Sequence, residues 1–231
     1  MALNLVTGGK REVETSMAGT FLSAGIFGVT DEQAMWRVKM DDDAQAFAQL
    51  VRRWEKPIQS LCARMTGDTH RGQDLTQEAF ARVFAGRKDY QASGKFATFL
   101  WRVALNLCYD ELRKVGRRRE SLLEDGGEES ESETLVAANP APDFALVEQE
   151  RAEAVRCALL KLSEPYRTVV VMRHYEGLKF REISEVLEIP EGTVKSRMAE
   201  ALAQLNDILT GLLNERESVC KTKTSPQVPA I

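Results

Sequence analysis

Apolar residues recur at steps of three and four along most of this chain, and the longest such run lies between residues 47 and 65. Residues at this spacing share one face of an α-helix, so the run predicts a long amphipathic helix. Its members are Phe47, Leu50, Val51, Trp54, Ile58, Leu61, Cys62 and Met65. Pro57 lies inside the run and predicts a kink or break, because proline lacks the amide hydrogen that a helix interior uses. No stretch alternates apolar and polar residues as a half-buried strand does, so the sequence predicts an all-α protein.

The stretch 120–150 separates two groups of predicted helices. It contains ten acidic residues and no Lys or Arg, together with the runs DGGEESESE and NPAP. Such a segment has too little apolar surface to order itself, so it predicts a flexible acidic linker. We therefore expect two small helical domains, at residues 31–119 and 151–213. Residues 1–30 and 214–231 are expected to be disordered extensions.

Few residue types suited to catalysis or metal binding occur in the chain. Its four cysteines form no CxxC pair, and His70 and His174 are the only histidines. The sequence has no zinc-ligand spacing, no Gly-rich phosphate loop and no supported Ser/His/Asp grouping, which argues against the common enzyme and metalloprotein classes. The apolar stretch 17–29 is too short to span a bilayer. We expect a cytoplasmic, non-enzymatic protein that uses no cofactor or metal and does not insert into a membrane.

Residues 180–205 have the pattern of a helix-turn-helix. A short amphipathic helix, FREISEVLEI, is followed by a turn at residues 190–192, after which Thr193 is expected to cap a second helix. The residues placed to pack the two helices together are Ile183, Leu187, Val194 and Met198. In such a unit the second helix enters the major groove with its N-terminal residues nearest the bases. The residues there that suit phosphates or base edges are Lys195, Ser196 and Arg197. A plain three-helix bundle with a solvated charged face would give the same pattern.

The charge of this unit limits what it can do alone. Between residues 173 and 198, five basic residues are matched by five acidic residues. The segment is therefore not broadly cationic, whereas DNA affinity depends on neutralising phosphates. We expect weak DNA binding by this domain alone and a partner that adds affinity.

The helix predicted from residue 96 to residue 114 has two apolar faces with a polar strip beside them. Two such faces indicate a helix wedged into a bundle with only the strip exposed. The strip consists of Arg102, Asn106, Asp110 and Arg113. Residues 94–119 carry seven basic and two acidic residues, and Phe96, Phe99 and Trp101 lie in the same segment. Cations that meet phosphates and rings that stack on bases suit single-stranded DNA. The aromatic rings would serve equally well as core residues, and for Trp101 this second interpretation is favoured.

Three motifs, in this order, resemble the extracytoplasmic-function class of bacterial sigma-70 factors. They are DLTQEAFARVF, FATFLWRVALNLCYDELRK and, after the acidic linker, SEPYRTVVVMRHYEGLKFREISEVLEIPEGTVKSRM. The resemblance covers residues 31–210 and implies a promoter-specificity subunit that binds the beta-prime and beta subunits of core RNA polymerase. It implies that the first domain recognises and melts the −10 element as single strands. The second domain, a winged-helix-like helix-turn-helix, would read the −35 element as duplex. An anti-sigma factor is a common partner in this family.

The resemblance also assigns roles to individual residues. The DLTQE helix would dock on the coiled coil of the beta-prime subunit, with Asp74, Gln77, Glu78 and Arg82 as its polar contacts. The implied −10 residues are Lys95, Phe96, Phe99, Trp101, Arg102, Asn106, Asp110 and Arg113. Among them Asn106 would lie near the pocket for a flipped base, and the loop 87–95 takes the place of the −10 specificity loop. The implied −35 residues are Thr193, Lys195, Ser196, Arg197 and Glu200.

The chain departs from the family pattern at both reading surfaces. The family usually carries arginines where this chain has Glu200 and Leu202. A carboxylate repels phosphate, although it can accept a hydrogen bond from a cytosine amine, so we expect a weaker or altered −35 preference. Many members also have Trp at the position of Phe99, whereas this chain has Trp101 two residues later. Which ring stacks on a base therefore stays open.

Two other functions fit parts of the sequence. One is a stand-alone helix-turn-helix regulator whose first domain senses a signal. The other is a protein-interaction adaptor with the sigma shape but without promoter binding, for which Glu200 is the best argument. The basic strip of residues 96–119 argues against the first, because a protein that reads duplex grooves has no need of a strand-melting helix.

Overall fold

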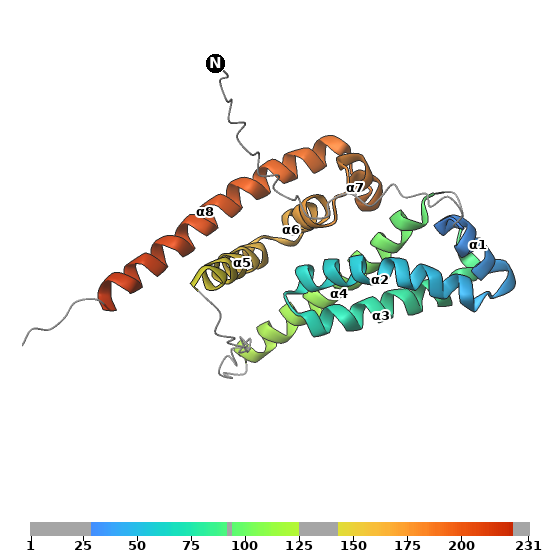
Figure 1. Ribbon diagram of the computed structural model, residues 1–231, viewed down its shortest axis with the longest axis horizontal. Coiled ribbons are helices and arrows are strands. Elements are labelled where there is room, and N and C mark those ends of the chain that lie inside the picture. The colour runs from blue at the N-terminus through green and yellow to red at the C-terminus, as the bar shows by residue number, and fades with distance from the viewer. Residues whose placement is uncertain (1–28, 92–93, 125–142, 224–231) are drawn as a thin grey trace, which may run out of the picture.

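The computed structural model describes residues 29–91, 94–124 and 143–223, and every regular element within them is a helix (Figure 1). The elements are α1 (Asp31–Asp41), α2 (Ala44–Thr66), α3 (Thr69–Ala85), the 3-10 turn η1 (Arg87–Asp89), α4 (Phe96–Glu124), α5 (Asp143–Lys161), α6 (Glu164–Val170), the π-helix η2 (Val171–Tyr175), α7 (Phe180–Leu187) and α8 (Glu191–Lys223). The prediction of an all-α protein is confirmed. The winged-helix-like description is wrong for the described part of the chain, because the residues after the helix-turn-helix continue as the single long helix α8.

The first break in the chain of helices lies at two aspartates and not at Pro57. Asp42 has a left-handed backbone, with φ of 51°. The Asp43 carboxylate then accepts hydrogen bonds from the amides of Gln45 and Ala46, which starts α2. α2 continues as helix with Pro57 inside it. The predicted kink or break at the proline therefore does not end the helix.

α2 and α3 approach each other closely at Gly72. A Cβ atom added there would lie 2.8 Å from the backbone nitrogen of Ala63 in α2. No real Cβ sits that close to a backbone atom, so the crossing of the two helices requires glycine at this position. The turn before α3 is closed by Asp68, whose carboxylate accepts from the amides of His70 and Arg71.

α4 lies in the centre of the first domain with both apolar faces buried, as its pattern predicts. The fully or almost fully buried residues of the two faces are Leu100, Trp101, Ala104, Leu105, Leu107 and Cys108. The Trp101 ring meets the Trp54 ring of α2 edge-on, with centroids 5.9 Å apart. This contact fixes which side of α4 remains for polar residues.

The second domain consists of α5 to α8. Ser163 is the N-cap residue of α6, and Gly177, with φ of 71°, lies where the chain turns from η2 toward α7. α7 and α8 pack through the residues predicted for a helix-turn-helix: Ile183 and Val194 are fully buried, and Leu187 and Met198 are partly buried.

α8 begins at Glu191, three residues earlier than a helix capped by Thr193 would begin. The Pro190 carbonyl accepts from the amides of both Thr193 and Val194. Thr193 therefore lies in the first turn of α8. The prediction that Thr193 caps this helix is wrong.

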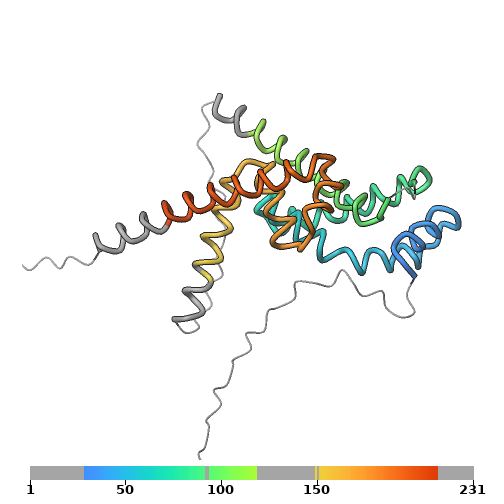
Figure 2. The backbone as a smooth tube through the Cα atoms, turned by 90° about the horizontal axis from the view of Figure 1, so that it is seen from above, coloured from blue at the N-terminus to red at the C-terminus, as the bar shows by residue number. Residues whose placement is uncertain are grey.

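The two groups of helices pack against each other. One hydrophobic cluster contains residues of α2 and α4 together with Val171, Met172 and Ile183 from the second domain. Figures 1 and 2 both show the orange segments α6, η2 and α7 against the cyan and green helices α2 and α4. α8 projects away from this contact along its later turns (Figure 2).

Helices occupy both ends of the range 120–150, for which the sequence predicts a flexible linker. α4 extends to Glu124 and α5 starts at Asp143, because apolar residues continue the helical spacing on both sides. Residues 125–142, like residues 1–28, lie outside the described residues. α8 reaches Lys223, so helix also covers the first part of the tail predicted from residue 214.

Candidate nucleic-acid interface

A cavity of about 540 Å³ lies at the start of α4 beside the loop that follows η1. It is lined by Gly86, Asp89, Tyr90, Gln91, Gly94, Lys95, Thr98, Phe99 and Arg102. Its volume falls within the range of about 300–1,000 Å³ that small-molecule pockets occupy. Lys95, Phe99 and Arg102 were predicted from the sequence, and the structure brings them together here.

Two aromatic rings form part of the cavity wall. The Tyr90 and Phe99 rings are tilted, with centroids 5.4 Å apart. Burial, and secondarily the nearby carboxylates of Glu32 and Asp31, raise the pKa of the Tyr90 hydroxyl, which therefore stays protonated at neutral pH. This hydroxyl has no hydrogen-bond partner among the described residues.

Two of the residues predicted to contact −10 DNA are buried in the structure. Phe96 is fully buried and Trp101 is 2% exposed, both within the core of the first domain. Their rings pack on Tyr90 and Trp54, respectively. The prediction that they contact DNA is therefore wrong for this structure, because a ring enclosed by its own core cannot stack on a base. Phe99, which is half-buried, is the ring that remains.

Sequence reasoning missed two residues of the cavity wall, Gly86 and Thr98, and it predicted the loop 87–95 without naming Tyr90 as a separate contact. Thr98 could have been found, because it lies four residues before Arg102 and so on the same face of the helix. Tyr90 belongs to the predicted loop 87–95, but the path of a loop does not follow from helical spacing, so the sequence did not show that its ring meets Phe99.

The polar strip of α4 continues from the cavity along the helix. Asn106 and Arg113 are exposed, and Asp110 lies between them with a carboxylate oxygen 3.5 Å from the Arg113 guanidinium. The predicted strip is thus formed, but its members differ in access to solvent. Arg102 is held by the second domain: its guanidinium donates to the carbonyls of Glu185 and Val186.

The start of α8 presents the second predicted group. Lys195 and Ser196 are exposed, while Thr193 and Arg197 are half-buried. The Lys195 ammonium lies 2.7 Å from the Glu191 carboxylate one turn earlier. The Ser196 hydroxyl donates to the Thr193 carbonyl. These side chains lie at the N-terminal end of a long helix, where a groove-reading helix places its contacts.

Glu200 lies on the same helix, exposed to solvent. Its carboxylate accepts a hydrogen bond of 2.9 Å from the Gln204 amide. Leu202 is 51% exposed. No described residue neutralises the Glu200 charge by an ion pair, so a negative charge remains close to the basic start of the helix.

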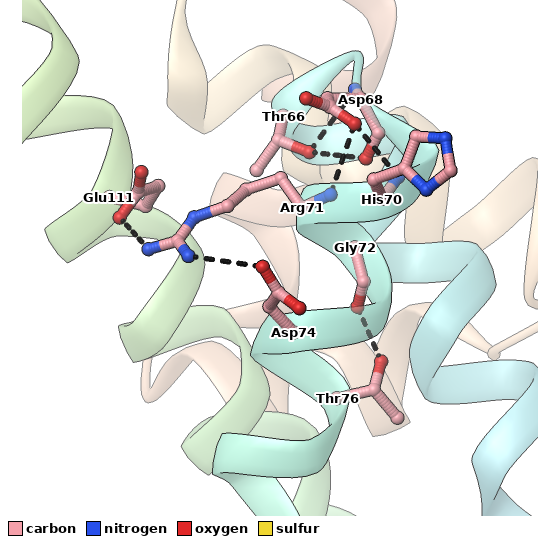
Figure 3. Close-up of polar contacts among 8 residues, drawn as sticks. All are labelled: Thr66, Asp68, His70, Arg71, Gly72, Asp74, Thr76 and Glu111. Atoms are coloured by element: carbon pink, nitrogen blue, oxygen red, sulfur yellow. Dashed lines mark hydrogen bonds and ion pairs between the residues drawn. The ribbon is translucent and has the colours of Figure 1, made fainter.

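The residues predicted to bind core polymerase share one exposed face of α3. They are Asp74, Gln77, Glu78 and Arg82. Glu78 and Arg82 form an ion pair of 2.6 Å along the helix. Figure 3 shows the Arg71 guanidinium between Asp74 and Glu111, a residue of α4, at 3.5 and 2.6 Å. Hydrogen bonding to Arg71 lowers the pKa of Glu111, so this link between α3 and α4 is charged at neutral pH.

Features typical of two other protein classes are absent from the described residues. Within the described ranges, no group of three or more His, Cys, Asp or Glu side chains is arranged to hold a metal ion. Over the same residues, no helix combines the length and apolarity that crossing a bilayer requires.

Two sequence families match the chain, in the same order as its two domains. Sigma-70 region 2 matches residues 50–118, and Sigma-70 region 4 matches residues 152–205. Among curated proteins, the ECF RNA polymerase sigma factor SigW of Bacillus subtilis is 37% identical over 172 residues, which cover 72% of this chain and 92% of SigW. The RNA polymerase sigma-H factor of Pseudomonas aeruginosa is 30% identical over 187 residues, or 80% of this chain and 96% of that factor.

Two solved structures share the fold. CnrH, solved in complex with the cytosolic domain of CnrY, superposes with a TM-score of 0.58 at 20% identity, over 78% of this chain and 97% of CnrH. The sigma factor RpoE of Bartonella quintana, solved with the anti-sigma factor NepR, gives a TM-score of 0.56 at 18% identity, over 72% of this chain and 98% of RpoE.

Proposed function

The chain belongs to the extracytoplasmic-function class of the sigma-70 family of RNA polymerase sigma factors, and we propose which of its surfaces perform each step of promoter recognition. A sigma factor of this class directs core polymerase to specific promoters and so initiates transcription. The comparisons do not favour the stand-alone regulator or the adaptor. The proposal assigns the −10 element and core docking to the helices up to α4, and the −35 element to α5–α8.

The −10 surface consists of the cavity at the start of α4 and the polar strip that follows it. Removing a base from the duplex stack costs a few kcal/mol, which a hollow with a stacking ring and hydrogen-bonding groups can offset. Phe99 is the stacking ring in this proposal, and Lys95 and Arg102 meet phosphates at the rim. Asn106, Asp110 and Arg113 then contact the strand along α4. The cavity beside Phe99 is the single observation that carries this assignment.

The −35 surface is the exposed start of α8. Lys195 and Arg197 contact phosphates or guanine edges, while Thr193 and Ser196 position the helix in the major groove. Glu200 limits the affinity of this surface, because its carboxylate faces the polyanion.

The face of α3 formed by Asp74, Gln77, Glu78 and Arg82 docks on the beta-prime coiled coil. Support comes from the exposure of all four side chains on one side of a helix whose other side is buried. The Arg71–Glu111 ion pair transmits the position of α3 to α4 (Figure 3).

The protein acts by binding and not by catalysis, in the cytoplasm where core polymerase and DNA are found. An anti-sigma factor is part of the proposal, since the solved RpoE relative is held by one.

Run-off transcription with purified core polymerase tests the proposal. The full chain is expected to give a promoter-dependent transcript only when core is present, and Phe99→Ala is expected to reduce open-complex formation without changing binding to a −35 duplex. Duplex binding without core-dependent transcription would support a stand-alone regulator. The absence of both activities would support an adaptor.

A further inference from the structure

The Tyr90 wall of the cavity belongs to a short turn that needs support from its neighbours. η1 spans three residues, and the backbone hydrogen bonds that close it run to the Gly86 carbonyl at 3.0 Å and to the Arg87 carbonyl at 3.3 Å. A single helical turn is unstable by itself, because few hydrogen bonds offset the ordering of its backbone. The separation of the Tyr90 and Phe99 rings therefore depends on contacts that other elements make with this turn.

The last turn of α1 makes two reciprocal contacts with this turn. The Lys39 ammonium donates a 2.7 Å hydrogen bond to the Tyr90 carbonyl, and the Lys88 ammonium donates one of 2.9 Å to the Lys39 carbonyl. The Lys39 carbonyl is among the last four of α1, which have no partner within the helix, and a cation is favoured at this end. A main-chain carbonyl is engaged on each side, so the contacts fix the backbone of Tyr90 relative to α1.

Asp42 adds two ion pairs at the same junction. It follows α1 with the left-handed backbone described above, which aspartate tolerates better than most residues. Its carboxylate lies 2.5 Å from the Arg87 guanidinium and 3.3 Å from the Lys88 ammonium. Hydrogen bonding to Arg87, and then to Lys88, lowers the pKa of the Asp42 carboxyl, which is therefore charged at neutral pH. Exposed ion pairs add little to stability, so their main effect is on the position of η1.

The other end of α1 holds the opposite wall of the cavity. The Glu32 carboxylate accepts a 3.2 Å hydrogen bond from the amide of Phe96, which begins α4 one turn before Phe99. Glu32 and Lys39 are about two helical turns apart, so they share one face of α1 and lie roughly 10 Å apart along its axis. α1 thus spans from η1 to the start of α4 (Figure 1). It is fixed to the core through its buried residues, Ala34, Met35 and Val38.

We propose that α1 is a strut for −10 recognition, in which Glu32, Lys39 and Asp42 are positioning residues that set the separation of the Tyr90 and Phe99 walls. The inference rests on the proposed function, since it concerns the cavity assigned there to a base of the −10 strand. A binding site distinguishes ligands only when supporting contacts hold its groups in place. α1 lies outside residues 50–118, which Sigma-70 region 2 matches, and it touches no DNA in this proposal. Loss of the strut loosens the cavity and weakens its choice between bases.

Base discrimination by the full chain bound to core polymerase tests the strut. Selection from a short randomised single-stranded library gives the preferred strand, and fluorescence anisotropy then compares it with strands that carry each other base at each position. Phe99→Ala identifies the position that the cavity reads, because discrimination is lost there. Lys39→Met is expected to reduce discrimination at that same position about fivefold, the order expected for the loss of one hydrogen bond. Lys39→Arg keeps a donor for the Tyr90 carbonyl and is expected to restore it.

A second variant and two matched controls complete the experiment. Asp42→Asn keeps a residue that tolerates the left-handed backbone but removes the charge, and is expected to reduce discrimination at the same position about threefold. Asp41→Asn makes the same change at an exposed neighbour, and Lys56→Met matches Lys39→Met at an exposed residue of α2. Both controls are expected to leave discrimination unchanged. Thermal unfolding of every variant separates a loss of stability from a loss of base choice.

The outcomes separate the strut from the proposed function. Unchanged discrimination in both Lys39→Met and Asp42→Asn, or an equal loss of affinity for every base, would overturn the strut while core-dependent transcription remains. A loss confined to positions that Phe99→Ala leaves unaffected would overturn it as well. If Lys39→Met lost its helical circular dichroism signal, Asp42→Asn, at an exposed site, would decide the question. Phe99→Ala without a position-specific effect, or wild type without core-dependent transcription, would instead refute the proposed function.

Discussion

At the scale of single residues, side chains of one chemical type have different roles according to what surrounds them. Phe96 and Phe99 lie three residues apart at the start of α4, yet Phe96 is fully buried and Phe99 lines the cavity. Arg102 and Arg113 both belong to the polar strip, but Arg102 is held by α7 and Arg113 is exposed. The burial and partners of each side chain therefore decide which predicted contacts remain plausible.

Replacement of Glu200 by arginine is expected to strengthen −35 binding. The exposed carboxylate repels phosphate, whereas an arginine there would neutralise one, so affinity for a −35 duplex should rise about fivefold and the salt dependence should steepen by about one phosphate contact. Fluorescence anisotropy over a salt series measures both. Glu200→Gln separates the removal of repulsion from the gain of a cation, and an unchanged affinity in both variants would show that Glu200 does not face DNA.

At the scale of elements, close crossings and caps position the helices that carry the surfaces. The α2–α3 crossing at Gly72 brings α3 close to α2, and the Arg71–Glu111 ion pair links it to α4. Both constraints lie beneath the face proposed to dock on core polymerase. Stability at this crossing and core binding are therefore expected to change together.

Gly72→Ala is expected to destabilise the first domain. The new Cβ would meet the Ala63 backbone at 2.8 Å, so the helices must move apart, at a cost of about 1–3 kcal/mol. The melting temperature should fall by roughly 2–4 °C for each kcal/mol. Gly211→Ala in α8, where no atom lies within 4 Å of the new Cβ, is the control and should be neutral or stabilising. Equal melting temperatures for wild type and Gly72→Ala would show that the crossing adjusts freely.

At the scale of the whole molecule, the two domains are joined by contacts that include the buried Glu176 carboxylate and the Arg102 guanidinium. Glu176 couples this contact to pH. Burial raises the pKa of the Glu176 carboxyl above its usual value of 4.5, and the Ser60 hydrogen bond and the Arg64 charge only partly oppose the rise. When the domains separate, the carboxyl returns to water and to its ordinary pKa.

Acidification is therefore expected to strengthen the contact between the two domains. A carboxyl whose pKa is raised by burial in the contact stabilises the contact fully below its ordinary pKa, and this stabilisation is lost as the pH rises through the raised pKa. The free energy of unfolding of wild type, measured by chemical denaturation, should thus gain a contribution from Glu176 as the pH falls from 7 toward 5. Glu176→Gln keeps a hydrogen-bonding group without a titrating proton and should lose this part of the pH dependence. The same pH profile in both proteins would contradict the role of Glu176.

The sequence by itself determined the helices, the helix-turn-helix and the family. These depend on local rules, such as the three- and four-residue spacing of apolar residues in α2 and α4 and the packing positions of Ile183 and Val194. The positions of residues along one segment are enough to predict these features, whatever residues pack against that segment from elsewhere in the chain. The exposed face of α3 followed from the same spacing.

Only the tertiary structure decided which aromatic rings are buried, where the cavity lies and how the two domains contact each other. Trp101 is enclosed because α2 places Trp54 against it, and Arg102 is occupied because α7 ends beside it. Both facts join residues far apart in the chain, and the helical pattern of either segment is the same with or without the partner. The physical reason is that local spacing fixes which face of a helix is apolar, whereas packing between distant helices fixes what covers it.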